Sequence, residues 1–216
     1  MQKISYFWIV LGCVLAFLRA CPAKSAAASL PGEDVKVQEE YCGTPISLRQ
    51  LLLRVSGLRP ICLEQYSADA ERLKNEVTLP TGARLSDLLS LVAKRGYLIT
   101  EHYGKVVYIR SENLKQRHVF DVGMPEFKYH GKMRGFKRQL GDIFSKLDYE
   151  PPDLGEINFH QRQVDGESRP GETIRDFLLR IEANGGTGWE LQIDSLDKKV
   201  ETVNGTYFPI RLIFGY

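Results

Sequence analysis

The stretch that decides the fold is Val77–Arg110, which reads VTLPTGARLSDLLSLVAKRGYLITEHYGKVVYIR. It contains four apolar residues at helical spacing, which are Leu85, Leu88, Leu89 and Val92. This spacing predicts a helix over about 84–94. Two β-rich runs follow at 97–103 and 106–110, and the two-residue connection Gly104-Lys105 predicts a tight hairpin between them. A helix beside a hairpin is typical of an α+β fold.

The residues before this stretch predict a second helix and a further strand. Ser47 begins the pattern Ser-Leu-Arg-Gln, in which a hydroxyl and a Gln side chain can satisfy free N–H groups at a helix start. Four apolar residues on one helical face follow, at Leu48, Leu51, Leu52 and Val55. We expect a strand over 60–66, and a polar leader with little structure over 29–41.

The second half of the chain repeats this plan at an offset of about 89 residues. Leu51 matches Leu140, and Leu85 matches Ile174, which follows Thr173 at the expected start of another helix. A fixed offset is what an internal duplication predicts, although two amphipathic helix pairs can also agree by coincidence. We therefore expect two βαββ-type units, 42–112 and 118–216, each with two helices packed on a small mixed sheet.

Two strands are expected to complete the second unit. Trp189, Leu191 and Ile193 alternate with polar residues, which predicts a strand with Trp189 in the core rather than in a surface ligand site. The last strand is expected over 207–214, and Pro209 suits it to the edge of a sheet.

The first residues predict an export signal. Lys3 precedes the apolar run Ile4–Leu18, and small residues follow at 23–28. A run of about 15 residues is short for a hydrocarbon core of about 30 Å, so we expect a cleaved signal peptide over 1–28 rather than a membrane anchor. Leu18–Cys21 is similar to a lipobox except for its Arg, so lipidation of Cys21 is the alternative. We expect an exported protein, periplasmic or membrane-anchored in preference to fully secreted, with no transmembrane span after cleavage.

Two cysteines, Cys42 and Cys62, remain after such cleavage. An oxidising compartment favours a disulfide between them, closing a loop that would contribute about 3 kcal/mol. The alternative is two free buried thiols. The absence of Cys-x-x-Cys argues against a thioredoxin-type redox site and a zinc ribbon.

Charge gives no sign of a nucleic-acid partner. The three charged residues of the first 25, Lys3, Arg19 and Lys24, are all basic, so the formal charge of +2 changes to about −1 without them. The basic stretch 128–138 is interpreted as a solvated helix start.

Residues suited to catalysis or metal binding are not arranged in a recognisable motif. The four histidines, His102, His118, His130 and His160, lack a metal-ligand spacing, and no nucleophile elbow or phosphate loop occurs. Glu150, Asp153 and Glu156 surround Pro151-Pro152, where paired carboxylates could hydrolyse glycans or hold calcium. A polar surface loop is the preferred interpretation. We expect no catalytic, cofactor-binding or metal-binding residues, no cofactor, and no enzyme activity.

The run Leu48–Arg110 resembles the short N-terminal (STN-like) domain of secretins and TonB-dependent receptors, and ETIRDFLLRIEANGGTGWELQI at 172–193 is similar to the same helix-to-strand step. In that family the unit is a periplasmic interaction module. The resemblance therefore implies a non-catalytic module that binds an envelope protein partner. An envelope hydrolase acting on glycans or esters through the loop carboxylates is the alternative, and a secreted inhibitor or effector is a third hypothesis.

Overall fold

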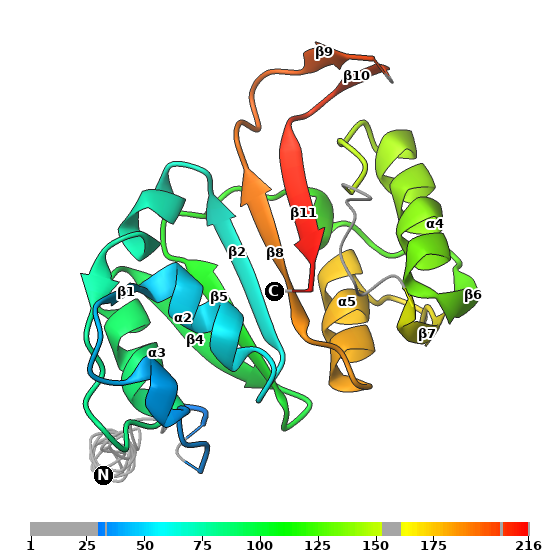
Figure 1. The fold of residues 1–216 in the computed structure, drawn as a ribbon. Helices are drawn as coiled ribbons and strands as arrows, with labels where there is room; N and C mark the ends of the chain where they lie inside the picture. The colour runs from blue at the N-terminus through cyan, green and yellow to red at the C-terminus, as the bar shows by residue number, and fades with distance from the viewer. Residues whose placement is uncertain (1–29, 33, 153–160, 204, 216) are drawn as a thin grey trace, which may run out of the picture.

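The computed structural model describes residues 30–32, 34–152, 161–203 and 205–215 (Figure 1). The fold is α+β, as the sequence predicts, with helices on both faces of a mixed five-stranded sheet and with smaller two-stranded sheets beside it. The predicted signal peptide 1–28 and the lipidation candidate Cys21 lie outside the described residues.

The five-stranded sheet combines strands from both halves of the chain. Its order is β11 (Ile210–Phe214), β8 (Gly188–Ile193), β2 (Ile61–Tyr66), β5 (Val106–Ser111) and β4 (Tyr97–His102). β2 runs parallel to both of its neighbours, and each outer strand runs antiparallel to its hairpin partner. The halves therefore share one sheet instead of forming two, because β2 accepts a hairpin on each side.

Two helices from each half cover opposite faces of this sheet. The four helices are α2 (Leu48–Val55), α3 (Leu85–Ala93), α4 (Met133–Lys146) and α5 (Ile174–Ala183). Ile61 and Leu63 of β2 pack in a core with α2 and α3, whereas Cys62 between them packs in a core with α4 and α5. Because successive side chains of a strand point to opposite faces, β2 takes part in both cores. In Figure 1, α2 and α3 lie beside β2 and β5, and α4 and α5 lie beyond β11.

The two halves share part of their order of elements. In the first, β1 (Ile46–Ser47) pairs antiparallel with β3 (Glu76–Val77), and in the second β6 (Lys128–Lys132) pairs antiparallel with β7 (Gln163–Glu167). Each pair encloses a helix, and each is followed by another helix and a hairpin. The first pair also encloses β2, which has no counterpart among the described residues between β6 and β7. The shared part of the order agrees with an internal duplication, which stays a prediction.

A two-stranded arm interrupts the second hairpin. It consists of β9 (Val200–Thr202) and β10 (Gly205–Tyr207), which pair antiparallel. Figure 1 shows the arm projecting beyond the end of the sheet.

Side-chain caps fix the helix starts that the sequence predicts. The Ser47 hydroxyl accepts the N–H of Gln50 at 3.2 Å, and the Thr173 hydroxyl accepts the N–H of Asp176 at 3.1 Å. These contacts satisfy N–H groups that have no partner within the helix. None of the helices in the described part of the chain has the length and hydrophobicity that a membrane span requires.

The leader has more structure than the sequence predicts. Val37 is 3% exposed, and its N–H donates to the carbonyl of Ala83 at 2.9 Å. The carbonyl of Val35 accepts the N–H of Leu85 at 2.8 Å, and a 3-10 turn follows at Glu39–Tyr41. The prediction of little structure is therefore wrong for residues 35–41, because Val35 and Val37 pack in the same core as α3.

The turn of the first hairpin lies one residue earlier than predicted. Tyr103 and Gly104 both have positive φ, 55° and 64°, and the N–H of Lys105 donates to the carbonyl of His102 at 3.1 Å. Two left-handed residues are the signature of a turn whose twist matches the flanking strands. The Arg59 guanidinium donates to the carbonyls of Gly104 and Lys105, at 2.8 and 2.7 Å, and holds this conformation.

Candidate functional site

A buried cluster of charged side chains joins the two halves of the protein beside β2. The carboxylate of Glu64 on β2 is fully buried and faces the guanidinium of Arg175 on α5. Arg175 Nε lies 2.7 Å from Glu64 Oε1, and Nη2 lies 3.1 Å from Oε2. The remaining Nη1 lies 2.6 Å from Asp121 Oδ1, in the 3-10 turn Val119–Asp121 that links the halves. Arg175 therefore ties three segments together.

His118 completes this cluster. Its Nδ1 accepts the N–H of Phe120 at 3.4 Å, and its Nε2 lies 3.4 Å from Glu64 Oε2. A ring nitrogen that accepts a hydrogen bond carries no proton, so the neutral tautomer has its proton on Nε2. The ring thus directs an N–H towards the Glu64 carboxylate.

The carboxylates of this cluster remain ionised at neutral pH. Burial alone would raise the pKa of Glu64, but hydrogen bonds from His118 and Arg175, together with the charge of Arg175, bring the pKa below its ordinary value. The pKa of Asp121 is also lowered, because the Arg175 hydrogen bond and the His118 backbone N–H outweigh the effect of burial. A general acid or base needs a pKa near the working pH. The two carboxylates are therefore suited to holding fixed charge.

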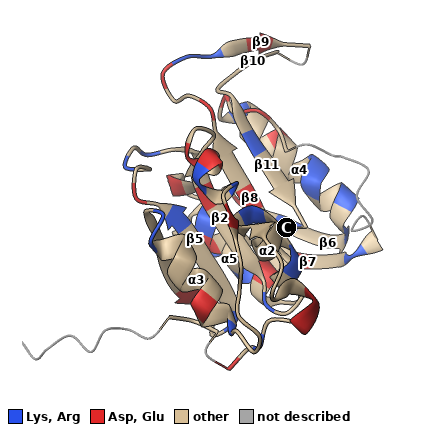
Figure 2. Ribbon diagram, turned by 60° about the vertical axis from the view of Figure 1, so that its left-hand side comes forward, with Lys and Arg blue, Asp and Glu red and all other residues tan. Residues whose placement is uncertain are grey.

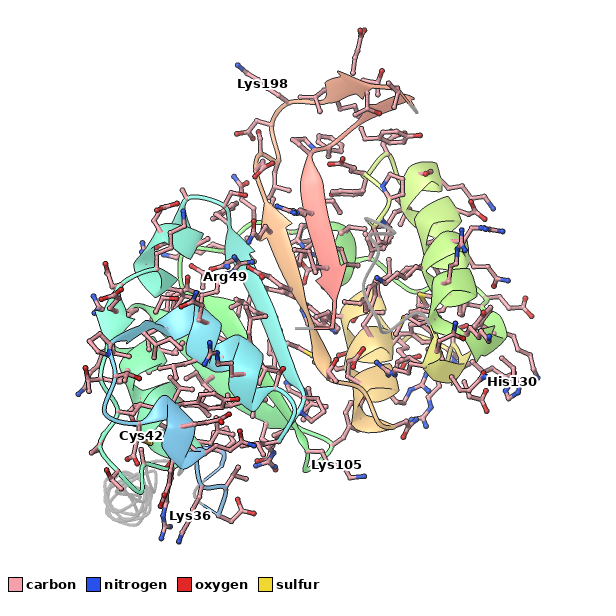
Figure 3. All side chains as sticks on the ribbon, viewed as in Figure 1. Lys36, Cys42, Arg49, Lys105, His130 and Lys198 are labelled. Atoms are coloured by element: carbon pink, nitrogen blue, oxygen red, sulfur yellow. The ribbon has the colours of Figure 1, made fainter. Side chains whose placement is uncertain are left out.

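A second buried carboxylate lies on the opposite face of the sheet. Glu190 of β8 is fully buried and accepts hydrogen bonds from Arg49 Nη2 and Gln65 Nε2, both at 2.8 Å. The Gln65 carbonyl oxygen in turn accepts the hydroxyl of Tyr97 at 2.6 Å. Arg49 reaches this position from α2 beside β2 (Figure 3). These bonds connect the first helix of one half to the central strands.

A third buried carboxylate lies next to the buried cysteine. Glu182 of α5 pairs with Arg162 Nη1 at 3.1 Å and accepts the N–H of Gly188 at 3.0 Å. Burial nevertheless raises the pKa of Glu182. Burial, together with the charge of Glu182, raises the pKa of the Cys62 thiol well above its usual value. Cys62 is therefore a poor nucleophile.

The predicted disulfide between Cys42 and Cys62 is wrong, because both cysteines are free. Cys62 lies in the core on the α4 and α5 side of the sheet, whereas Cys42 packs against the core on the other side. The Cys42 thiol lies 3.7 Å from the carbonyl oxygen of Gln38 (Figure 3). The strand alternation that turns Cys62 away from Ile61 and Leu63 separates the two sulfurs.

Of the three predicted loop carboxylates, one lies in the described part of the chain, and it lines a cavity. Glu150 lines a space of about 830 Å³ together with Asp142 and Asp194. The cations of this lining are Lys137, Arg138 and Arg211. Two of them come from α4, along which basic residues recur (Figure 2). The other two predicted loop carboxylates, Asp153 and Glu156, lie outside the described residues.

The remaining histidines are not brought together. His102 stacks edge-on against Tyr108 at 5.5 Å, and exposed His130 lies 3.7 Å from Asp165 Oδ2. His160 lies outside the described residues. No group of three or more His, Cys, Asp or Glu side chains suited to a metal ion occurs in the described part of the chain.

The outer strand β4 offers a free sheet edge. β4 pairs with β5 on one side, and no described strand pairs with it on the other. Leu98 is 55% exposed there, and Thr100 and Glu101 are also exposed. The opposite edge strand, β11, is preceded by a bridge between Phe208 and Tyr149.

Sequence reasoning missed the three buried glutamates, although it placed Trp189 correctly in the core. Glu64 directly follows the three apolar residues Ile61–Leu63 of β2, and this position could have marked it as buried. Glu190 is one of the polar residues that alternate with Trp189, Leu191 and Ile193, but Arg49 of α2 covers that side of the strand. No family model matches the chain, and comparison with curated proteins and with solved structures likewise finds no match.

Proposed function

We propose that this protein is a non-catalytic interaction module of the bacterial cell envelope. In this proposal it is exported, stays in the periplasm or on the membrane, and binds a protein partner through the free edge of β4. The export signal and the STN-like resemblance support the location and the role. The single observation that carries the binding mode is that no strand among the described residues pairs with the outer side of β4, where Leu98 is exposed.

An edge strand binds a partner strand because its outer N–H and C=O groups lack partners in the sheet. β4 is suited to this because its other side is paired with β5 over its whole length, from Tyr97 to His102. An ion pair of 2.9 Å between Arg59 and Glu101 further anchors the strand. A rigid edge requires little ordering when a partner strand is added.

The buried carboxylates support a structural framework instead of a catalytic one. Glu64, Glu182 and Glu190 are all fully buried, and each is bound to an Arg. Groups that are enclosed in this way do not reach a substrate. They stabilise the sheet whose edge the proposal uses.

A crosslinking experiment in the producing cell tests the proposal. A photoreactive amino acid placed at Leu98 should crosslink to one discrete envelope protein. The same group at Leu53, which is 37% exposed on α2, should not crosslink to that protein. The substitution Leu98→Lys should abolish capture of this partner by affinity purification, whereas the matched Leu53→Lys should leave capture unchanged.

The opposite pattern would contradict the proposal. If Leu98→Lys binds the crosslinked partner as well as the unmodified protein does, the β4 edge is not the binding site. If neither position gives a discrete crosslink and the protein fractionates with the cytoplasm, both the role and the location are wrong.

A second candidate, an envelope hydrolase, is favoured by one observation. Glu150 and Asp142 line the same cavity, whose volume of about 830 Å³ lies within the range of small-molecule sites. Glycan and ester substrates should be hydrolysed by the protein, and Glu150→Gln should abolish that hydrolysis. Activity that persists in Glu150→Gln and in Asp142→Asn would exclude this candidate.

A further inference from the structure

A cationic notch lies where the turn between β4 and β5 meets the second half of the protein. Its volume is about 270 Å³, and its lining residues are Tyr103, Lys105, Arg169, Arg180, Ala183 and Asn184. Three of these residues are basic and none is acidic. Lys105 stands at the tip of the turn (Figure 3).

One of the three cations is held in place by an acid behind the notch. Arg180 Nε and Nη2 lie 2.8 Å from the two carboxylate oxygens of Glu172, and Nη2 also donates to the carbonyl of Glu167 at 2.7 Å. The Glu172 side chain is 7% exposed. The charge of Glu172 is therefore neutralised by Arg180, and these bonds hold the Arg180 side chain in one position at the side of the notch.

The other two cations remain available at the opening. Lys105 and Arg169 are both exposed, and no described carboxylate lies within ion-pair distance of either side chain. Arg169 does bind Glu172, but through its backbone N–H, at 3.0 Å. Asn184 is a further polar residue of the same lining.

Contacts to the turn that carries Lys105 fix the position of this residue. The Arg59 guanidinium donates to the carbonyls of Gly104 and Lys105, and the Tyr103 hydroxyl approaches the carbonyl of Asp176 at the start of α5, at 3.5 Å. The turn therefore does not have to be ordered when an anion is bound, which favours binding.

We propose that this notch binds a phosphate group. Its volume lies below the range of about 300–1,000 Å³ for whole drug-sized ligands, so it suits a single small group. Lys and Arg are the side chains that bind phosphate oxygens through charge-assisted hydrogen bonds. The phosphate could be free or carried by a lipid headgroup, and the two sources share this chemistry.

Titration of the purified protein tests the proposal without any knowledge of a protein partner. Inorganic phosphate at low ionic strength should give saturable NMR shifts of the amides in the turn, at Arg169 and near Asn184. Sodium chloride at matched ionic strength should not reproduce them, because screening alone is not site-specific. Co-sedimentation with vesicles of phosphatidylglycerol, compared with vesicles of phosphatidylcholine, identifies the lipid source.

Two double variants with the same change of charge provide the comparison. Lys105→Ala/Arg169→Ala should weaken binding of phosphate or of the anionic vesicles at least about tenfold, since each charge-assisted hydrogen bond contributes roughly that factor. Lys94→Ala/Arg95→Ala removes two exposed cations at the end of α3 and should leave binding unchanged. Equal effects of the two double variants, or shifts that chloride reproduces, would overturn the proposal. Such a result would leave the β4 binding mode untouched.

Discussion

Removal of the Arg175 guanidinium should leave a buried charge without its main partner. In the protein, Glu64 is 0% exposed and Arg175 holds both of its carboxylate oxygens, at 2.7 and 3.1 Å. The substitution Arg175→Ala removes both contacts and also the bond to Asp121. Breaking a buried ion pair by removing one partner costs about 3–5 kcal/mol. Since domains of this size have an unfolding free energy of roughly 5–15 kcal/mol, the variant should still fold but lose much of its stability.

Urea unfolding followed by circular dichroism at neutral pH measures this loss. With an m value near 2 kcal/mol/M, a loss of about 3–5 kcal/mol lowers the unfolding midpoint by about 1.5–2.5 M. The control is Lys128→Ala, which removes a surface ion pair with Glu167 whose side chains are 79% and 68% exposed. Exposed pairs contribute about 0–1 kcal/mol, so this midpoint should move little.

The pH dependence of Arg175→Ala gives an independent check. Without Arg175, burial should raise the folded pKa of Glu64 above its unfolded value. A raised folded pKa favours the folded state at low pH and penalises it as the pH rises. The difference in unfolding free energy between the variant and the unmodified protein should therefore narrow from pH 7 towards about pH 5.

A double variant separates the loss of a partner from the loss of packing. Glu64→Gln/Arg175→Met removes both charges, and replacing a whole buried pair is often close to neutral. The double variant should therefore be more stable than Arg175→Ala. The reasoning is refuted if Arg175→Ala costs less than about 1 kcal/mol, or if the double variant is the less stable of the two.

Three further predictions concern acid stability, the thiols and one glycine. The folded pKa values of Glu64 and Asp121 are lowered, so their contribution to stability is present above their unfolded pKa values and is lost at lower pH. Urea midpoints should therefore fall as the pH drops below about 4. A midpoint unchanged at pH 3 would contradict this. Cys42 should react with an alkylating reagent in the folded protein, and Cys62 only after unfolding, as mass spectrometry of peptides can show; equal reaction rates would show that Cys62 is accessible. Gly188→Ala should abolish folding or lower the free energy of unfolding by more than about 4 kcal/mol, since a Cβ there would lie 1.8 Å from the carbonyl oxygen of Ile61. Gly43 also has a positive φ but lies in open space, so Gly43→Ala should lower it by only about 1–2 kcal/mol, as thermal unfolding can measure.

The helices and hairpins could be predicted from the sequence because their signals are local. The helix that Ser47 caps and the helix that Thr173 caps begin where the sequence places them. Pro209 marked the last strand as an edge strand, and β11 is at the edge. In each case the decisive residues lie within one or two turns of each other.

The assembly of the sheet could not be predicted, because it depends on distant contacts. Ile61 pairs with Gly188, and no local pattern specifies that parallel pairing. The same limit explains the buried glutamates, since Glu64 and its partner Arg175 are far apart in the chain. The disulfide prediction failed for a related reason, because pairing of Cys42 with Cys62 was inferred without knowledge of the face on which each lies.

The central place of β2 has a consequence for the order in which the protein can assemble. The first 112 residues carry a strand whose second neighbour, β8, is synthesised only near the end of the chain. Until then the side of β2 that bears Cys62 and Glu64 has neither its apolar cover nor Arg175. A fragment that stops after β5 should therefore be prone to aggregation. The five-stranded sheet should form in one late step, once β8 and β11 are available.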